Sequence, residues 1–134
     1  MTPRCDLETL TRLFAPIIWA IILLWLSLTS SPPQLPGVLG WDKLLHAGAY
    51  GLLTVLIAQL LVYLFFDSGK FWWRAGLAAI AYGGLLEILQ LLAQTGRTAE
   101  WWDLCADAFG AFIAYLIFRN VPYLSNAHHN RHDE

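Results

Sequence analysis

The chain has 134 residues, of which 57% are hydrophobic and only 13% are charged, and its formal net charge is −2. Because a soluble domain normally carries about a quarter charged residues, this composition argues against a soluble protein. A net charge near zero gives no basis for a nucleic-acid partner. The two cysteines, Cys5 and Cys105, form neither a metal-binding nor a disulfide pattern. We therefore expect one membrane domain over residues 1–120, followed by a polar cytoplasmic tail over residues 121–134.

A helix needs about 20 predominantly apolar residues to cross a bilayer. The sequence contains four apolar segments near this length, at about residues 13–29, 44–66, 71–93 and 103–118. Pro32, Pro33 and Pro36 form a loop after the first segment, and polar turns separate the others. The predicted fold class is therefore all-α, an integral membrane four-helix bundle.

The first segment has a second interpretation, as a cleaved signal peptide. Arg4 and Arg12 give it a basic start, and its apolar core is short. Asp6 and Glu8 dilute that basic start, and no clear cleavage site of small residues follows. We therefore expect a retained membrane helix.

Lysine and arginine residues predict the orientation of the bundle, because the cytoplasmic loops of membrane proteins carry an excess of them. The side that includes the N-terminus carries six of them: Arg4, Arg12, Lys70, Arg74, Arg119 and Arg131. The other side carries Lys43 and Arg97. We therefore predict that both termini are cytoplasmic. In this orientation Trp41, Trp101 and Trp102 lie at the outer interface of the membrane, where tryptophan is enriched.

Polar residues from three of the predicted helices converge at this outer face. The second and fourth helices begin there and the third ends there, so the following residues reach one membrane level: Asp42, Lys43, His46, Tyr50, Glu87, Gln90, Arg97, Asp103 and Asp107. A charged side chain within a membrane costs roughly 2.5–3.5 kcal/mol on insertion scales, and those that persist usually face a protein interior, a cavity or a partner. The convergence predicts a pocket that opens to the outer face, with Glu87 at its floor.

Helical spacing places the polar residues of each segment on one face. The second helix presents Asp42, His46 and Tyr50, the third presents Glu87 and Gln90 with Gly83, and the fourth presents Asp103 and Asp107 with Gly110. Small residues allow membrane helices to approach closely. We therefore expect these three faces to meet inside the bundle.

His46, Glu87 and Asp107 are the candidate catalytic residues, because a carboxyl group beside a histidine is a suitable acid–base set. The candidate substrate-binding residues are Asp42, Lys43, Tyr50, Gln90, Arg97 and Asp103. A histidine with two or three carboxylates also suits a divalent metal. We nevertheless assign no residue to a metal, and the sequence identifies no cofactor.

The same residues also have a structural interpretation. Asp42 and Asp103 suit the N-caps of helices, and Gln90 could hydrogen-bond a neighbouring helix. An ion pair between helices could serve packing alone. Glu87 and Asp107 fit this interpretation less well, because capping does not explain acids inside helices.

Three motifs occur in order over about half of the chain: Asp42-Lys43-x-x-His46-x-x-x-Tyr50, Glu87-x-x-Gln90 and Asp103-x-x-x-Asp107-x-x-Gly110, with Arg97 between the last two. In order and spacing they resemble the VanZ-like family of bacterial membrane proteins, which is named after a teicoplanin-resistance protein. Asp107 departs from the family pattern, because members more often have asparagine there. The resemblance implies a multi-pass protein of the bacterial cytoplasmic (inner) membrane, and it implies no settled activity.

The residues and the resemblance together lead to a functional hypothesis. We expect a protein in the lipid bilayer whose outer pocket binds or acts on an anionic envelope lipid or the head group of a lipid-linked cell-wall precursor, with a link to teicoplanin resistance. Lys43 and Arg97 would contact phosphate, and His46, Glu87 and Asp107 would handle protons or a metal. The alternative is a non-catalytic protein that alters antibiotic access or scaffolds partner proteins. Whether the protein is an enzyme stays open, and a homo-oligomer is allowed.

Overall fold

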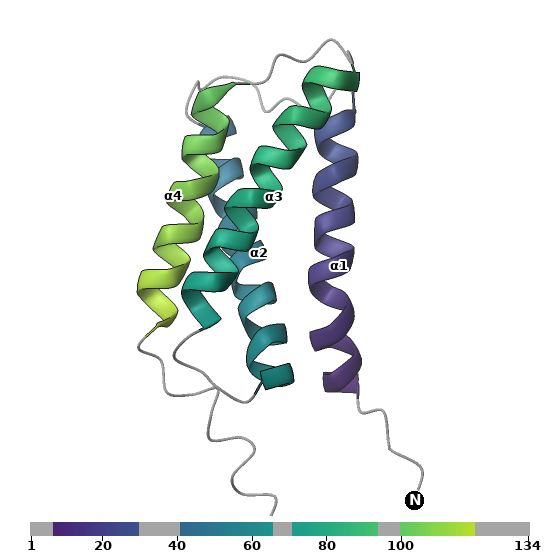
Figure 1. The fold of residues 1–134 in the computed structure, drawn as a ribbon, viewed down its shortest axis with the longest axis vertical. Helices are drawn as coiled ribbons and strands as arrows, with labels where there is room; N and C mark the ends of the chain where they lie inside the picture. Colours follow the sequence, from purple (N-terminus) through teal and green to yellow (C-terminus); the bar gives the residue numbers. More distant parts are fainter. Residues whose placement is uncertain (1–6, 30–40, 66–70, 94–99, 120–134) are drawn as a thin grey trace, which may run out of the picture.

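Four α-helices form a bundle in the computed structural model, which describes residues 7–29, 41–65, 71–93 and 100–119. They are α1 (Leu7–Leu28), α2 (Trp41–Phe65), α3 (Phe71–Ala93) and α4 (Trp101–Phe118), and no strand occurs among the described residues (Figure 1). All four are long and apolar enough to cross a membrane. The predicted all-α fold with four membrane-spanning helices is confirmed, whereas the orientation of the termini stays a prediction.

Large apolar side chains cover the outside of the bundle. Ile18 on α1, Leu77 on α3 and Phe109 on α4 are 55%, 56% and 61% exposed. Soluble proteins rarely expose contiguous apolar surface, whereas lipid tails are as apolar as these side chains. The outward surface of the helices is therefore the lipid-facing surface.

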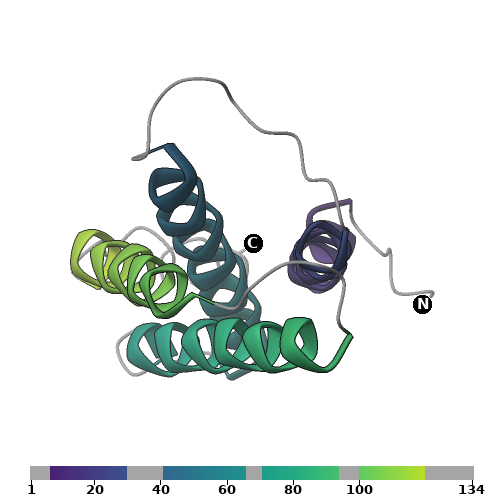
Figure 2. The ribbon, with the colours of Figure 1, turned by 90° about the horizontal axis from the view of Figure 1, so that it is seen from above.

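The helices α2, α3 and α4 pack against one another, and α1 lies beside α2 and α3 (Figure 2). The most extensive contact joins α2 to α4. Leu53 on α2 and Leu86 on α3 are buried in the upper core cluster, and Trp72 is buried in a second cluster nearer the opposite end. We call the end where α1 and α3 finish and α2 and α4 begin the polar end of the bundle; it is the upper end in Figure 1.

Glycine brings the backbones of α2 and α4 into direct contact near the polar end. A Cβ atom placed on Gly110 would lie 2.7 Å from Cα of Ala47 and would collide with the carbonyl group of the same residue. A Cβ atom on Gly51 would lie 3.2 Å from the carbonyl oxygen of Gly110. Close approach of this kind is how small residues stabilise helix pairs in membranes. It confirms the predicted role of Gly110 at a packing face.

Three side chains hold α1 to the other helices by hydrogen bonds to backbone carbonyl oxygens. Trp19 Nε1 donates to Ala49 at 3.0 Å, and Tyr82 Oη donates to Ala20 at 2.7 Å. At the polar end Gln90 Nε2 donates to Ser27 at 3.0 Å. The Ser27 carbonyl lies in the last turn of α1, where carbonyl groups lack the regular donors of the helix interior, and Gln90 supplies a hydrogen bond there.

α3 begins at Phe71 as the apolar pattern predicts, whereas the other three helices begin earlier. α1 begins at Leu7 rather than near residue 13, because Glu8 and Arg12 form an i,i+4 ion pair of 2.6 Å that a helical turn favours. α4 begins at Trp101, with Glu100 as its N-cap residue. Asp103 therefore lies within the first turn of α4 and not at the N-cap position.

Candidate functional site

Seven ionisable side chains gather at the polar end of the bundle. We call them the polar cluster: Asp42, Lys43 and His46 from α2, Glu87 from α3, and Glu100, Asp103 and Asp107 at the start of α4. Five are acids, and the other two are a lysine and a histidine. The cluster forms because the glycine contact between α2 and α4 brings the first turns of these helices together.

Lys43 is surrounded by carboxylates. Its Nζ atom forms an ion pair with the Asp103 carboxylate, and it lies 3.1 Å from Glu100 Oε2 and 3.4 Å from Asp42 Oδ2. The Asp103 side chain is only 10% exposed, whereas that of Lys43 is 32% exposed. A buried carboxylate needs a compensating charge, so Lys43 neutralises Asp103 and joins α2 to α4.

His46 is oriented by Asp107. Nδ1 of His46 lies 2.9 Å from Asp107 Oδ1, and the Asp107 side chain is 1% exposed. When Asp107 is ionised, Nδ1 carries the proton and donates the hydrogen bond, because an ionised carboxylate only accepts hydrogen bonds. The Nε2 atom lies 3.8 Å from Asp103 Oδ2, which is too long for a hydrogen bond. The pair therefore fixes the ring and leaves Nε2 available to another group.

Gly83 on α3 leaves the space into which Asp107 and Tyr50 fit. A Cβ atom on Gly83 would lie 2.7 Å from Asp107 Oδ2 and 3.1 Å from Cε1 of Tyr50. The Tyr50 ring lies parallel to the His46 ring, with an interplanar angle of 5° and 6.4 Å between centroids. The spacing of His46 and Tyr50 predicted this shared face, and the structure adds that α3 contacts it through a glycine.

Glu87 bonds to the start of α4 and not to His46. Its Oε2 atom accepts a hydrogen bond of 3.1 Å from the backbone N–H of Glu100. In the part of the chain that the structure describes, this amide is its hydrogen-bond partner, and the His46–Asp107 pair forms without it. Glu87 thus binds the N-cap residue of α4, where a negative charge is favourable.

Gln90 and Arg97 complete the predicted set. Gln90 bonds to α1 through Ser27, as its structural interpretation predicted, and does not join the polar cluster. Arg97 lies outside the described residues. Glu100 was missed because it precedes the fourth apolar segment; its position directly before Trp101, at a helix start, is the signal that could have identified it.

The cluster has one candidate set of metal ligands. Ligand atoms of Asp42, His46 and Asp103 lie within 4.8 Å of one another. Lys43, however, bonds to both of those carboxylates, so its ammonium group already supplies a positive charge there. The geometry favours proton exchange or hydrogen bonding at His46 Nε2 over metal binding.

The ion network around Lys43 predicts a measurable stability effect. Replacing Lys43 with methionine leaves the buried Asp103 carboxylate without its cation, and we expect a loss of roughly 1–3 kcal/mol of unfolding free energy. Adding Asp103→Asn to this variant should recover part of the loss, because the amide carries no charge. Unfolding of the purified protein in detergent micelles measures both effects.

Arg12→Met is the matched control, because Arg12 pairs with Glu8, whose side chain is 61% exposed. Such helix-surface pairs contribute only about 0.3–0.5 kcal/mol. Equal losses for Lys43→Met and Arg12→Met would contradict a stabilising role for the ion network.

Comparison with known proteins identifies the family of this chain. The family model described as VanZ/LLP1 matches residues 14–123. No curated protein and no solved structure matches the chain. The match includes α1 from residue 14 onward, the whole of α2, α3 and α4, and every residue of the polar cluster. The chain therefore belongs to the VanZ/LLP1 family.

Proposed function

We propose that this VanZ-family membrane protein binds the anionic head group of an envelope lipid or of a lipid-linked cell-wall precursor at its polar cluster, and that His46 exchanges a proton or a hydrogen bond with that head group. The observation that carries the proposal is the His46–Asp107 pair, in which a buried carboxylate holds the ring through Nδ1. A histidine oriented in this way presents Nε2 to a ligand in a fixed direction.

A phosphate oxygen is a suitable partner for Nε2. When both ring nitrogens are protonated, histidine is a double donor, and Asp107 compensates the added positive charge on the other side of the ring. Hydrogen bonds between charged groups contribute about 1.5–3 kcal/mol each. The same geometry serves a general acid that donates to a leaving oxygen, so both binding and catalysis are compatible with it.

Lys43 is less available to bind an anionic head group than the sequence predicted. Three carboxylates surround its ammonium group, and an incoming phosphate would have to compete with them. The remaining positive charge in the proposal comes from His46 and from Arg97, which lies outside the described residues.

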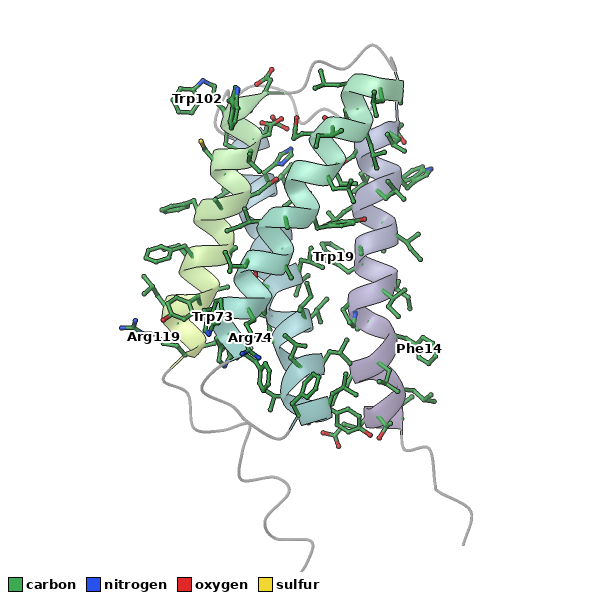
Figure 3. The ribbon with its side chains drawn as sticks, viewed as in Figure 1. Phe14, Trp19, Trp73, Arg74, Trp102 and Arg119 are labelled. Atoms are coloured by element: carbon green, nitrogen blue, oxygen red, sulfur yellow. The ribbon has the colours of Figure 1, made fainter. Side chains whose placement is uncertain are left out.

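We further propose that the polar end faces the outside of the bacterial inner membrane, where a bound envelope lipid or precursor could affect the response to teicoplanin. Arg74 and Arg119 lie at the end opposite Trp102 (Figure 3), in agreement with an excess of basic residues on the cytoplasmic side.

Cys105 on α4 is exposed near the polar end. In a Cys5→Ser variant, a membrane-impermeant maleimide should label Cys105 on intact spheroplasts, and labelling only after lysis would reverse the orientation.

A non-catalytic role is the second candidate, and one observation favours it. Lys43 forms ion pairs with Glu100 and Asp103, and His46 pairs with Asp107, so these contacts join α2 to the start of α4. Lys43 also pairs with Asp42 on its own helix. Such a network also suits a bundle that scaffolds partner proteins or alters antibiotic access without binding a head group.

His46→Gln separates these two functions. Glutamine cannot provide both ring nitrogens in their fixed positions, so we expect phosphatidylglycerol to bind roughly tenfold more weakly, which is about 1.4 kcal/mol. Native mass spectrometry of the detergent-purified protein, titrated with phosphatidylglycerol, measures the affinity. The teicoplanin concentration that inhibits an expressing host should fall at unchanged protein level.

Tyr82→Phe is the control, because it removes a hydrogen bond between helices without touching the polar cluster. It should leave lipid affinity unchanged. If His46→Gln binds phosphatidylglycerol as the wild type does and preserves resistance, the head-group proposal is wrong and the non-catalytic role is favoured.

A further inference from the structure

In the described part of the bundle, different members of the polar cluster line three grooves between the helices. The groove between α3 and α4 is lined by Glu87 and Glu100, and the groove between α2 and α4 is lined by Lys43. The groove between α1 and α2 is lined by Asp42, His46 and Tyr50. Of these three grooves, the one between α1 and α2 is therefore the one that leads to the imidazole ring.

The groove between α1 and α2 changes from polar to apolar along its length. Asp42, His46 and Ser27 line it at the polar end, and its wall toward the middle of the membrane is apolar. That wall consists of Trp19 and Leu23 from α1 and of Ala49 and Leu52 from α2, and Leu26, Leu44 and Leu45 add apolar side chains near Ser27 and His46. Its volume of ≈ 460 Å³ lies within the range of about 300–1,000 Å³ that is usual for ligand sites.

Trp19 crosses this groove from α1 to α2. Its Nε1 atom donates a hydrogen bond of 3.0 Å to the backbone oxygen of Ala49. Leu45 and Leu52 in the same groove are 52% and 43% exposed, so the groove opens toward the lipid. A ligand that enters from the bilayer can therefore place an apolar chain along these residues and a polar group at His46.

We propose that the groove between α1 and α2 holds a hydrocarbon chain of the lipid whose head group lies at His46. This inference rests on the proposed function and adds to it that the ligand enters sideways from the membrane and is recognised by its chain as well as its head group. The groove between α3 and α4 suits this occupant less well, because its two ionisable residues are carboxylates, which repel an anionic head group. In the groove between α2 and α4, Lys43 is already bonded to carboxylates.

Two glycines provide a matched test of which groove holds the hydrocarbon chain. Gly48 lines the groove between α1 and α2, and Gly84 lines the groove between α3 and α4. A Cβ atom on either glycine would meet no other atom within 4 Å, so a larger side chain has room to extend. Leucine also favours a helix more than glycine does. Both Gly48→Leu and Gly84→Leu should therefore fold, and each should fill one groove.

Binding of phosphatidylglycerol to the detergent-purified variants, measured by native mass spectrometry, decides between the grooves. We expect Gly48→Leu to weaken binding at least tenfold and Gly84→Leu to bind as the wild type does. Wild-type affinity in Gly48→Leu, loss in Gly84→Leu alone, or equal losses in both would overturn the chain site.

His46→Gln in the same titration separates the two proposals. If it weakens binding while Gly48→Leu does not, the head-group site stands and only the chain site is wrong. If His46→Gln has no effect, the head-group proposal itself is wrong.

Discussion

The contact between the backbones of α2 and α4 at Gly110 and Ala47 is the constraint on which the site depends. Ala47 follows His46 directly, and Gly110 lies nearly one turn after Asp107. Because the helices touch here without an intervening side chain, the His46 ring lies within 2.9 Å of a carboxylate on the other helix. A side chain at position 110 would separate the two helices and would move His46 away from Asp107. The glycine is thus a requirement of the His46–Asp107 pair as well as of the packing.

The buried acids at this contact have local partners even though acids exceed bases in the polar cluster. Asp103 and Asp107 are the two most buried acids of the polar cluster, and each has a nitrogen partner on α2. The more exposed Asp42 and Glu100 contact the ammonium group of Lys43 from its outer side. A buried pair keeps its stability only while both partners are present. These two acids are therefore partnered within the protein, and His46, whose Nε2 takes no part in the bond to Asp107, lines the groove between α1 and α2.

The sequence predicted the helices and the grouping of Lys43, His46, Asp103 and Asp107, because apolar length and helical spacing depend on local sequence alone. Their functional roles stay predictions. The positions of Glu87 and Gln90 could not be derived in the same way: spacing shows which residues share a face, but not which neighbour that face contacts. Glu87 bonds to the Glu100 amide, 13 residues later in the chain, and Gln90 bonds to Ser27 on α1, 63 residues earlier. The grooves likewise depend on tertiary packing, which periodicity does not contain.

The state of the His46 ring is the most direct test that the polar cluster is a binding site. The ¹⁵N spectrum of histidine-labelled protein in bilayers, with His46 assigned by its absence in a His46→Gln variant, reports the two ring nitrogens separately. We expect Nδ1 to give the signal of a protonated nitrogen bonded to Asp107, unchanged between phosphatidylcholine and phosphatidylglycerol bilayers, and Nε2 to shift in phosphatidylglycerol. An Nε2 signal that is the same in both lipids would contradict a head-group site and would leave the cluster as a structural network between α2 and α4.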